Sequence, residues 1–380
     1  MRAAWDHHCR RLWIANVHDP KVAAYDLELF LDMAWDIDAV TPRTVGAHLE
    51  RWLSTQFGED VGRAIAPALR ELCRLNAIRR PEFMGWTQVE LDRKKYPGGK
   101  SVPSKTELTR EEGLERMNDF ARIEAIVDSC GKAVPERLQD AYFAHVLYPV
   151  HAAAAMTRKM LSDSGLGYGE IQTLTERYNT MNDGKWKGLM SAAPRNLPVF
   201  APEARTEFNE ERRTKNEERN TKDEKNGQWS MFNGQCVARN ACDYDRNSGG
   251  CTVIDMLGHS MKAVALTKGC TLSYDFDSPE EGDAVVRIAL IPTQPSDRGD
   301  LRCEVRLGDG APSVISLKEP YRSEEWKRNV LRCQALKETP VRLTKGRHTL
   351  YIKALDDHIV VDQWMVDFER DRAFYVIPAR

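Results

Sequence analysis

Several features that would place the chain in a common class are missing from its 380 residues. No apolar run reaches the roughly 18 residues that a transmembrane helix needs, so we expect no membrane partner. A formal net charge of −2 supplies no basic field for nucleic acid. The start, MRAAWDHHCRR, is polar and broken, which is untypical of a signal peptide. The length then predicts a globular protein of two or three domains.

Motifs that bind metals or cofactors are missing as well. The sequence has no C-x-x-C, H-E-x-x-H, G-x-S-x-G or Walker pattern, which argues against several metal, hydrolase and nucleotide sites. The adjacent run His7-His8-Cys9 has no partners at ligand spacing. The glycines at 165, 167 and 169 lack the G-x-G-x-x-G spacing. We predict no metal and no cofactor.

The nine cysteines are unevenly placed, and six of them fall between residues 236 and 333. Those six could form disulfides if the protein is exported. Free, partly buried thiols are the alternative, and it is the one that we favour.

Residues 39–200 show the apolar spacing of helices and predict a helical bundle. Aliphatic and aromatic side chains recur at steps of three and four, as in Leu49, Trp52 and Leu53. The expected helices cover residues 43–57, 60–76, 109–129 and 135–161.

Three local signals refine this bundle. Thr41-Pro42 fits a helix N-cap followed by proline at the first helical position. The run Tyr96–Gly99 predicts a loop between the second and third helices. Pro149 should kink the fourth helix, because proline removes a backbone donor from the helix interior.

Residues 201–228 form a segment of different character. Between Arg205 and Lys225 there are seven basic and seven acidic residues. The segment has too few apolar residues to fold alone. We predict a charged linker, with a solvated helical spacer as the alternative.

Residues 229–380 show a period of two, which is typical of strands. Many short strands without intervening helices predict an antiparallel β-sandwich. The expected strands cover residues 252–257, 261–266, 271–276, 284–291, 301–307, 313–317, 341–344, 348–355 and 359–368.

Residues 1–38 belong to neither pattern. Leu12–Val17 is a short apolar run that predicts a strand, and a helix over Tyr25–Trp35 follows it directly. A lone parallel strand cannot satisfy its own hydrogen bonds or bury both faces. The segment is therefore predicted to be one β/α unit of a larger α/β fold.

This strand–loop–helix, LWIANVHDPKVAAYDLELFLDMAWD, resembles a segment of glycoside hydrolase family 115. There the last barrel strand carries an Asn-Val-Gly-Asp-x-Lys-Pro-like motif, and the helix after it a Phe-Phe-Leu-Asp-Tyr-Ala-Trp-like stretch. His18 replaces the glycine, and Val22 stands where proline is usual. The matching residues are Asn16, Val17, Asp19, Lys21, Phe30, Leu31, Asp32, Ala34 and Trp35.

The resemblance continues in order through the rest of the chain, apart from the charged segment. It includes the family's bundle-closing motif and parts of its C-terminal sandwich. The matching segments are Gln56–Gly58, Arg80–Met84, Ala141–Phe143, Val146–Val150, Gly184–Trp186, Leu257–Ser260, Ile291–Thr293 and Gly346–Leu350.

The resemblance implies a fold and an activity. Members of the family remove α-1,2-linked glucuronic acid or its 4-O-methyl ether from xylan, with inversion. They combine an α/β domain, a (β/α)8 barrel, a helical bundle and a C-terminal sandwich. We therefore expect a multidomain α+β chain with a remnant β/α unit of a TIM barrel, the bundle and the sandwich, and a glucuronoxylan-like polysaccharide as partner.

The same resemblance points to Asn16, Asp19 and Lys21 as substrate-binding residues, because they follow a barrel strand at its carboxyl end. Inversion needs two carboxylates on opposite sides of the bond. Only Asp19 lies near this position, so we predict no catalytic residue. The alternative, which we favour for the chain on its own, is that Asn16 and Asp19 cap the next helix.

The tryptophans and two aspartates of the later segments offer further carbohydrate contacts. Trp364 alternates with apolar strand residues and is expected in the core. Asp356 or Asp362 could help the sandwich bind polysaccharide, with or without a calcium ion. Trp186, Trp229 and Trp326 are weaker candidates for sugar stacking.

Three hypotheses follow for the whole chain. It is an inactive portion of a family 115 enzyme, or a non-catalytic carbohydrate-binding or scaffold protein. In the third, it completes an enzyme with a chain that carries the rest of the barrel, and a homo-oligomer is a further option. Members of the family are often exported, which leaves the compartment open.

Overall fold

The computed structural model describes residues 1–84, 106–162, 166–202, 204–206, 208, 236–296 and 298–379. It divides into two compact units. The first unit comprises Met1–Cys73 and Glu115–Arg205, and the second comprises Arg74–Leu114 and Thr206–Arg380. The loop predicted at 96–99, most of the charged segment and Trp229 lie outside the described residues.

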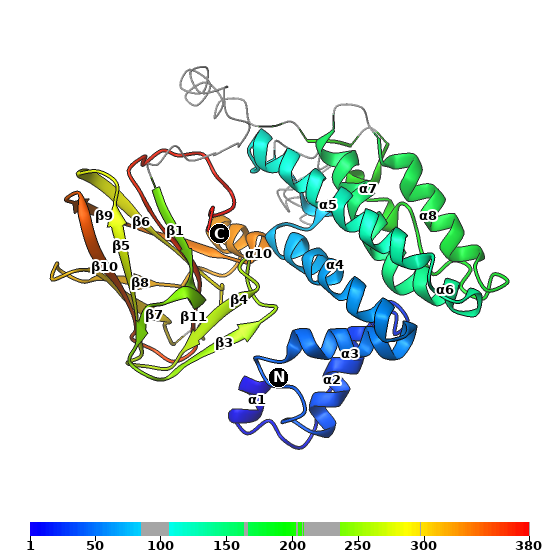
Figure 1. The fold of residues 1–380 in the computed structure, drawn as a ribbon, viewed down its shortest axis with the longest axis horizontal. Helices are drawn as coiled ribbons and strands as arrows, with labels where there is room; N and C mark the ends of the chain where they lie inside the picture. The colour runs from blue at the N-terminus through cyan, green and yellow to red at the C-terminus, as the bar shows by residue number, and fades with distance from the viewer. Residues whose placement is uncertain are drawn as a thin grey trace. The chain divides into compact units, whose positions relative to one another are not determined.

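The first unit is helical, as expected (Figure 1). The helix α8 was not predicted. Within the described residues, no helix is long and apolar enough to cross a membrane. Helix α4 ends in the second unit, and α5 begins there. The helices of the first unit are α1 (Arg2–Asp6), α2 (Ala24–Trp35), α3 (Val45–Phe57), α4 (Glu59–Ile78), α5 (Arg110–Gly131), α6 (Gln139–Tyr142), α7 (Tyr148–Leu161) and α8 (Tyr168–Thr180).

The predicted apolar stripe of α3 is buried, including Leu49 and Leu53. The helix begins at Val45 after Thr44, so the predicted cap at Thr41-Pro42 is wrong. Residues 41–44 instead form a turn in which the Thr44 amide donates to the Thr41 carbonyl at 3.0 Å. This turn satisfies local backbone groups before the helix starts.

A glycine sets how closely α3 and α4 pack. A Cβ on Gly62 would lie 2.3 Å from the Ser54 backbone nitrogen. The absence of a side chain at Gly62 therefore lets the two backbones approach each other.

Pro149 perturbs its helix as expected, although the perturbation is a widened turn. Residues Phe143–Leu147 form a π-helical segment between α6 and α7. Proline supplies no amide and its ring clashes with the carbonyl four residues before it. A π turn relieves both problems without ending the helical path.

The predicted strand at Leu12–Val17 is wrong, because the structure places these residues in no strand. A strand needs a neighbour for its backbone groups, and the described residues provide none here. Leu12 and Ile14 are 76% and 81% exposed, which confirms the expected poor cover. Trp13 packs against Phe30 of α2, with ring centroids 5.7 Å apart.

Amide exchange should report this exposure. Within the described residues, the amides of Leu12–Val17 make no backbone hydrogen bond. We expect their hydrogen exchange, followed by mass spectrometry, to be complete while amides of α3 remain protected. Protection of residues 11–17 equal to that of α3 would contradict the prediction.

The second unit holds two antiparallel sheets (Figure 1). Sheet A has the order β3-β4-β11-β6-β9, with β1 also paired to β11, and sheet B has the order β2-β5-β10-β7-β8. Helix α10 (Glu324–Arg332) lies between β8 and β9, so the expectation that no helix interrupts the strands is wrong. The strands are β1 (Cys236–Asn240), β2 (Arg246–Asn247), β3 (Cys251–Asp255), β4 (Lys262–Leu266), β5 (Thr271–Ser278), β6 (Gly282–Leu290), β7 (Arg302–Leu307), β8 (Ser313–Ser316), β9 (Ala335–Leu343), β10 (Gly346–Ala354) and β11 (Ile359–Asp367).

The predicted sandwich is confirmed, and its core lies among the inward-facing residues of both sheets. Trp364 is fully buried, with ring centroids 5.3 Å from Tyr274 and 5.6 Å from Phe276. All nine cysteines are free thiols, in agreement with the interpretation that we favoured.

Two buried polar clusters stiffen this unit. In the first, Asp362 accepts hydrogen bonds from the backbone amides of His259 and Ser260 and from the Ser260 hydroxyl and the Gln334 amide. Gly258 has φ +79°, and a Cβ there would lie 2.3 Å from the Asp362 carboxylate. Glycine at 258 is therefore what admits the carboxylate.

In the second cluster, Asp367 lies between two buried arginines. It accepts from Arg287 Nη1 at 2.6 Å and from Arg372 Nε at 2.8 Å. Arg287 also donates to Glu338 at 2.8 Å. Each guanidinium thus keeps a carboxylate partner inside the protein, as buried charges require.

Candidate functional site

The turn that carries Asn16, Asp19 and Lys21 precedes α2 without capping it. Asn16 is exposed. The Asp19 backbone carbonyl accepts from the amides of Val22 and Ala23, and no side chain caps the helix. The capping alternative for Asn16 and Asp19 is therefore wrong, because residues 20–23 form a turn that separates them from the first helical turn.

Lys21 lies on an indole ring that it shares with a second lysine. Its Nζ is 4.7 Å from the Trp186 ring centroid, and Lys185 Nζ is 5.1 Å from the same centroid. Partial burial and the charge of Lys185 lower the pKa of Lys21, while the charge of Asp140 acts in the opposite direction. Two ammonium groups thus lie at one aromatic ring beside the turn.

His145 of the π-helical segment is next to this pair. Burial, followed by the charge of Lys21, lowers the pKa of His145 to about 4. Its ring contacts Trp52 edge to face at 5.9 Å. The imidazole is therefore neutral at neutral pH and able to donate one hydrogen bond and accept another.

Asp19 is close enough to the buried Tyr178 of the bundle for its charge to act on that phenol. Burial raises the pKa of Tyr178 to about 12, with further contributions from Tyr148 and from the charge of Asp19. The rings of Tyr148 and Tyr178 are 4.8 Å apart. Asp19 also contacts the exposed His18 ring at 2.6 Å.

The chain after α8 can turn back to this site because of its local sequence. Asn182, Asp183 and Gly184 all have positive φ, a conformation that glycine, asparagine and aspartate adopt most readily. The Asn182 amide donates to Asp140 at 2.9 Å. The Asn179 carboxamide accepts from Gly188 and Met190, which fixes the segment that presents Lys185 and Trp186.

The structure thus gives two of the three predicted residues a common environment. Asp19 and Lys21 face residues of one apolar cluster of the bundle, which includes Tyr178 and Trp186. Lys185 and Trp186 belong to a segment that the sequence had singled out by resemblance alone, and His145 was not predicted. The arrangement can bind an anion, because two cations lie at one ring.

The aspartates proposed for the sandwich have other partners. Asp362 is fully buried in the polar cluster described above, so the suggestion that it binds polysaccharide is wrong. Asp356 accepts from Arg302 Nε at 2.9 Å and from the Arg302 amide at 3.0 Å. Trp326 packs against Tyr321, with ring centroids 5.2 Å apart. Among the described residues no group of three or more His, Cys, Asp or Glu side chains could hold a metal ion.

Known proteins resemble this chain at both ends of its sequence. Residues 1–83 match the family model for glycosyl hydrolase family 115, and residues 233–380 match that for the glycosyl hydrolase family 115 C-terminal domain. No curated protein matches the sequence.

Among solved structures, the chain is similar to BtGH115A, described as a family GH115 4-O-methyl-alpha-glucuronidase with specificity for decorated arabinogalactans. The identity is 33% and the TM-score 0.79, over 96% of this chain and 47% of that one. The chain thus spans about half the length of that relative.

Two carbohydrate-binding modules show more local likeness. The C-terminal CBM6 of LamC from Zobellia galactanivorans is 12% identical over 35% of this chain and 98% of that one, with TM-score 0.27. A family 35 module from Clostridium thermocellum is 10% identical over 34% of this chain and 96% of that one, with TM-score 0.27.

Proposed function

This chain belongs to glycoside hydrolase family 115, and from that premise we propose that it is part of an α-glucuronidase that cleaves α-1,2-linked (4-O-methyl)glucuronic acid from a polysaccharide. The observation that carries the proposal is the pair of ammonium groups on Trp186. The feature that separates glucuronic acid from neutral sugars is its carboxylate. Burial, followed by the charge of Lys185, lowers the pKa of Lys21, and a carboxylate placed between the two lysines would offset both effects.

We assign the three turn residues distinct roles in this site. Lys21, with Lys185, binds the uronic acid carboxylate. Asn16 and Asp19 hydrogen-bond to sugar hydroxyls, because an exposed carboxamide and a carboxylate supply both donors and acceptors. Trp186 supports the two lysine side chains and offers an apolar ring edge to the sugar.

We infer that the described residues near Lys21 do not supply the acid and base that inversion requires. These two carboxylates stand roughly 6.5–9.5 Å apart, with room for a water between them. Near Lys21, Asp140 is occupied by the Asn182 amide and Asp19 by His18. We therefore propose that the 380 residues alone do not hydrolyse glycosides, and that further barrel strands, in the same polypeptide or a second chain, provide the catalytic pair.

Two assays test this function separately. The chain should release no glucuronic acid from glucuronoxylan, and turnover by the chain alone would overturn the proposed inactivity. The chain should nevertheless bind free glucuronate, measured by isothermal titration calorimetry. Lys21→Met should weaken this binding about tenfold, the loss of one charge-assisted contact.

The exposed Lys187 is the matched control for Lys21. Lys187→Met changes the net charge equally but lies beside the site, so its affinity should equal that of the unsubstituted chain. Equal losses for both variants would show attraction by overall charge alone and would contradict the assigned role of Lys21. Binding of glucuronate without any loss in Lys21→Met would do the same.

A further inference from the structure

The outer face of sheet B is a second charged surface, far in sequence from the turn at Asn16. Side chains alternate along each strand, and Leu272, Tyr274, Leu350 and Ile352 point into the core. The residues between them therefore share the opposite face. Those with charge are Arg246, Arg302, Arg306, Arg347, Lys353, Asp275, Asp277 and Glu304, five basic and three acidic, although the whole chain has a net charge of −2.

Strand register places four residues of this face on one line. Arg246 is paired with Ser273, Ser273 with Tyr351, and Tyr351 with Arg306. The line crosses β2, β5, β10 and β7. At about 4.8 Å per strand, the two arginines at its ends lie about 14 Å apart, with the Tyr351 ring between them.

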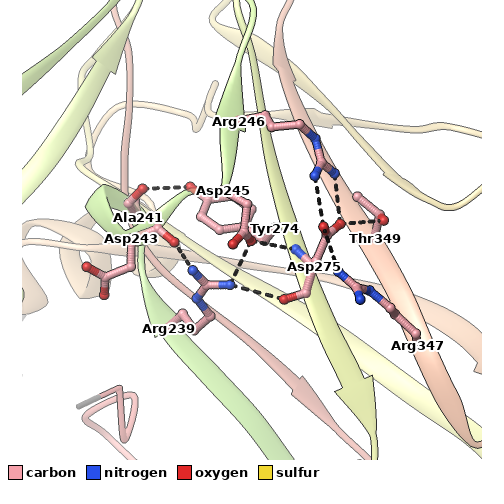
Figure 2. Close-up of polar contacts among 9 residues, drawn as sticks. All are labelled: Arg239, Ala241, Asp243, Asp245, Arg246, Tyr274, Asp275, Arg347 and Thr349. Atoms are coloured by element: carbon pink, nitrogen blue, oxygen red, sulfur yellow. Dashed lines mark hydrogen bonds and ion pairs between the residues drawn. The ribbon is translucent and has the colours of Figure 1, made fainter.

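The arginines at the β2 end have donors to spare. Asp275 accepts from Arg246 Nη1 and Nη2 at 2.8 Å, from Arg347 Nη2 at 3.4 Å and from the Thr349 hydroxyl at 2.7 Å (Figure 2). Each guanidinium has five N–H donors. One carboxylate thus holds two guanidiniums, whose side chains stay 57% and 77% exposed.

A network beneath these side chains fixes them in place. Asp245 accepts from Arg239 Nη1 at 2.9 Å and from the Asp275 amide at 2.7 Å (Figure 2). The Tyr274 hydroxyl donates to the Ala241 carbonyl at 2.8 Å. Because Asp245 immediately precedes Arg246, these bonds hold the short strand β2 and its arginine against β5.

The β7 end combines a charge with a flat ring. The Arg306 guanidinium lies 4.2 Å from the Tyr351 ring centroid, and Tyr351 is half-buried. Arg306 Nη1 donates to the Gly308 carbonyl, and a guanidinium has five N–H donors in all, so donors remain for a ligand. Planar groups of this size suit the apolar faces of sugar rings.

We propose that this line, Arg246–Tyr351–Arg306 with Arg347 beside it, binds a polysaccharide that bears uronic acids. Charge complementarity favours that occupant. Carboxylates of uronic acids pair with the arginines, while Asp277 and Glu304 accept hydrogen bonds from sugar hydroxyls. The same two carboxylates would repel a densely charged chain such as a nucleic acid.

The choice of a uronic acid polysaccharide as the ligand rests on the proposed function. The existence of the charged surface is independent of that function. The surface would hold a branched chain by residues distinct from those at Lys21. A single polysaccharide then has two places of attachment on one protein, which raises its apparent affinity if both can be occupied together.

Affinity gel electrophoresis of the full chain tests the proposal. We expect retardation by glucuronoxylan and little by a neutral arabinoxylan. Tyr351→Ala should weaken binding about tenfold, and Arg306→Gln and Arg347→Gln about threefold to tenfold each. Added salt should weaken the affinity of the unsubstituted chain more than the affinity of the arginine variants, because those variants have lost a charge.

Arg342→Gln, an exposed arginine on sheet A, is the matched control and should bind like the unsubstituted chain. A thermal melt of each variant checks that the sandwich is folded. Lys21→Met should keep this retardation, so failure of the uronate site and failure of this surface are distinguishable. The proposal is overturned by equal retardation in neutral arabinoxylan, by stronger retention in a single-stranded DNA gel, or by folded Tyr351 and arginine variants that bind normally.

Discussion

Replacing Asp367 by alanine should lower the free energy of unfolding of the sandwich by about 3–5 kcal/mol. The carboxylate is fully buried between Arg287 and Arg372, whose side chains are 1% and 7% exposed. Without it, the carboxylate partners that remain are the half-exposed Glu338 for Arg287 and Glu369, at 3.5 Å, for Arg372. Arg287 also keeps the backbone carbonyls of Glu369 and Arg370, which carry no net charge. Two desolvated guanidiniums would then have too little negative charge beside them. Removing one partner of a buried ion pair is strongly destabilising, because it leaves the other charge uncompensated.

The measurement is urea denaturation monitored by hydrogen exchange of β11 peptides, which reports on this unit alone. Asp283→Ala is the matched control, because Asp283 of β6 pairs with Arg342 of β9 in the same sheet but both side chains are largely exposed. Surface pairs of this kind contribute about 0–1 kcal/mol. Similar losses for the two variants would show that the buried cluster is dispensable.

The sandwich should also lose stability as the pH falls below about 6.5, and His259 should be a major cause. Burial, followed by the charge of Arg332, lowers the pKa of His259 from 6.5 to about 3. Between these values the unfolded chain binds a proton that the folded chain excludes. Stability therefore rises with pH in this window, by at most about 1.4 kcal/mol per unit and about 4–5 kcal/mol in total.

His259→Gln isolates this contribution. Glutamine has no charge to gain and can still donate to the Arg332 carbonyl, which His259 Nε2 contacts at 2.8 Å. Burial raises the pKa of Asp362 and Glu112, which gives the opposite pH dependence, and both proteins share these groups. The unsubstituted chain should lose more stability between pH 6.5 and 4 than His259→Gln. Parallel curves would exclude His259 as the cause.

The sandwich was the part of the fold that the sequence predicted best. Alternation along β5 and β10 separates core residues such as Tyr274 and Leu350 from polar ones, and turns interrupt it regularly. Nine expected strands formed, while β1 and β2 were missed. Tertiary contacts decide which strands they pair with, as when β1 pairs with β11 in the register Cys236 to Asp367. Strands as short as β1, with five residues, and β2, with two, show little periodic signal.

The two errors in the first unit, the strand at Leu12–Val17 and the missed helix α8, have different physical origins. The apolar run at Leu12–Val17 has the composition of a strand, but composition cannot provide the neighbouring strand. Helix α8 was missed because few of its residues are buried, Thr175 and Tyr178 among them, so its apolar stripe is weak. Helices with long buried faces, such as α3, were predicted to within a few residues.

For the candidate site, the sequence indicated the turn but not its surroundings. Asn16, Asp19 and Lys21 were chosen by resemblance to a barrel strand end. His145 lies more than a hundred residues away, and its lowered pKa depends on burial and on Lys21, which no local pattern encodes. The sequence does not separate Trp186 from the other tryptophans. The structure does, because it places Lys21 over the Trp186 ring.

The edge strand β9 bears on whether copies of this chain can join through their sheets. An unpaired edge attracts strands from other molecules, and a regular ladder of amides is what they copy. In β9, Pro340 offers no amide, and Lys337, Glu338 and Arg342 place charges along the same edge. Fibre-like stacking of sandwiches through β9 is thereby discouraged.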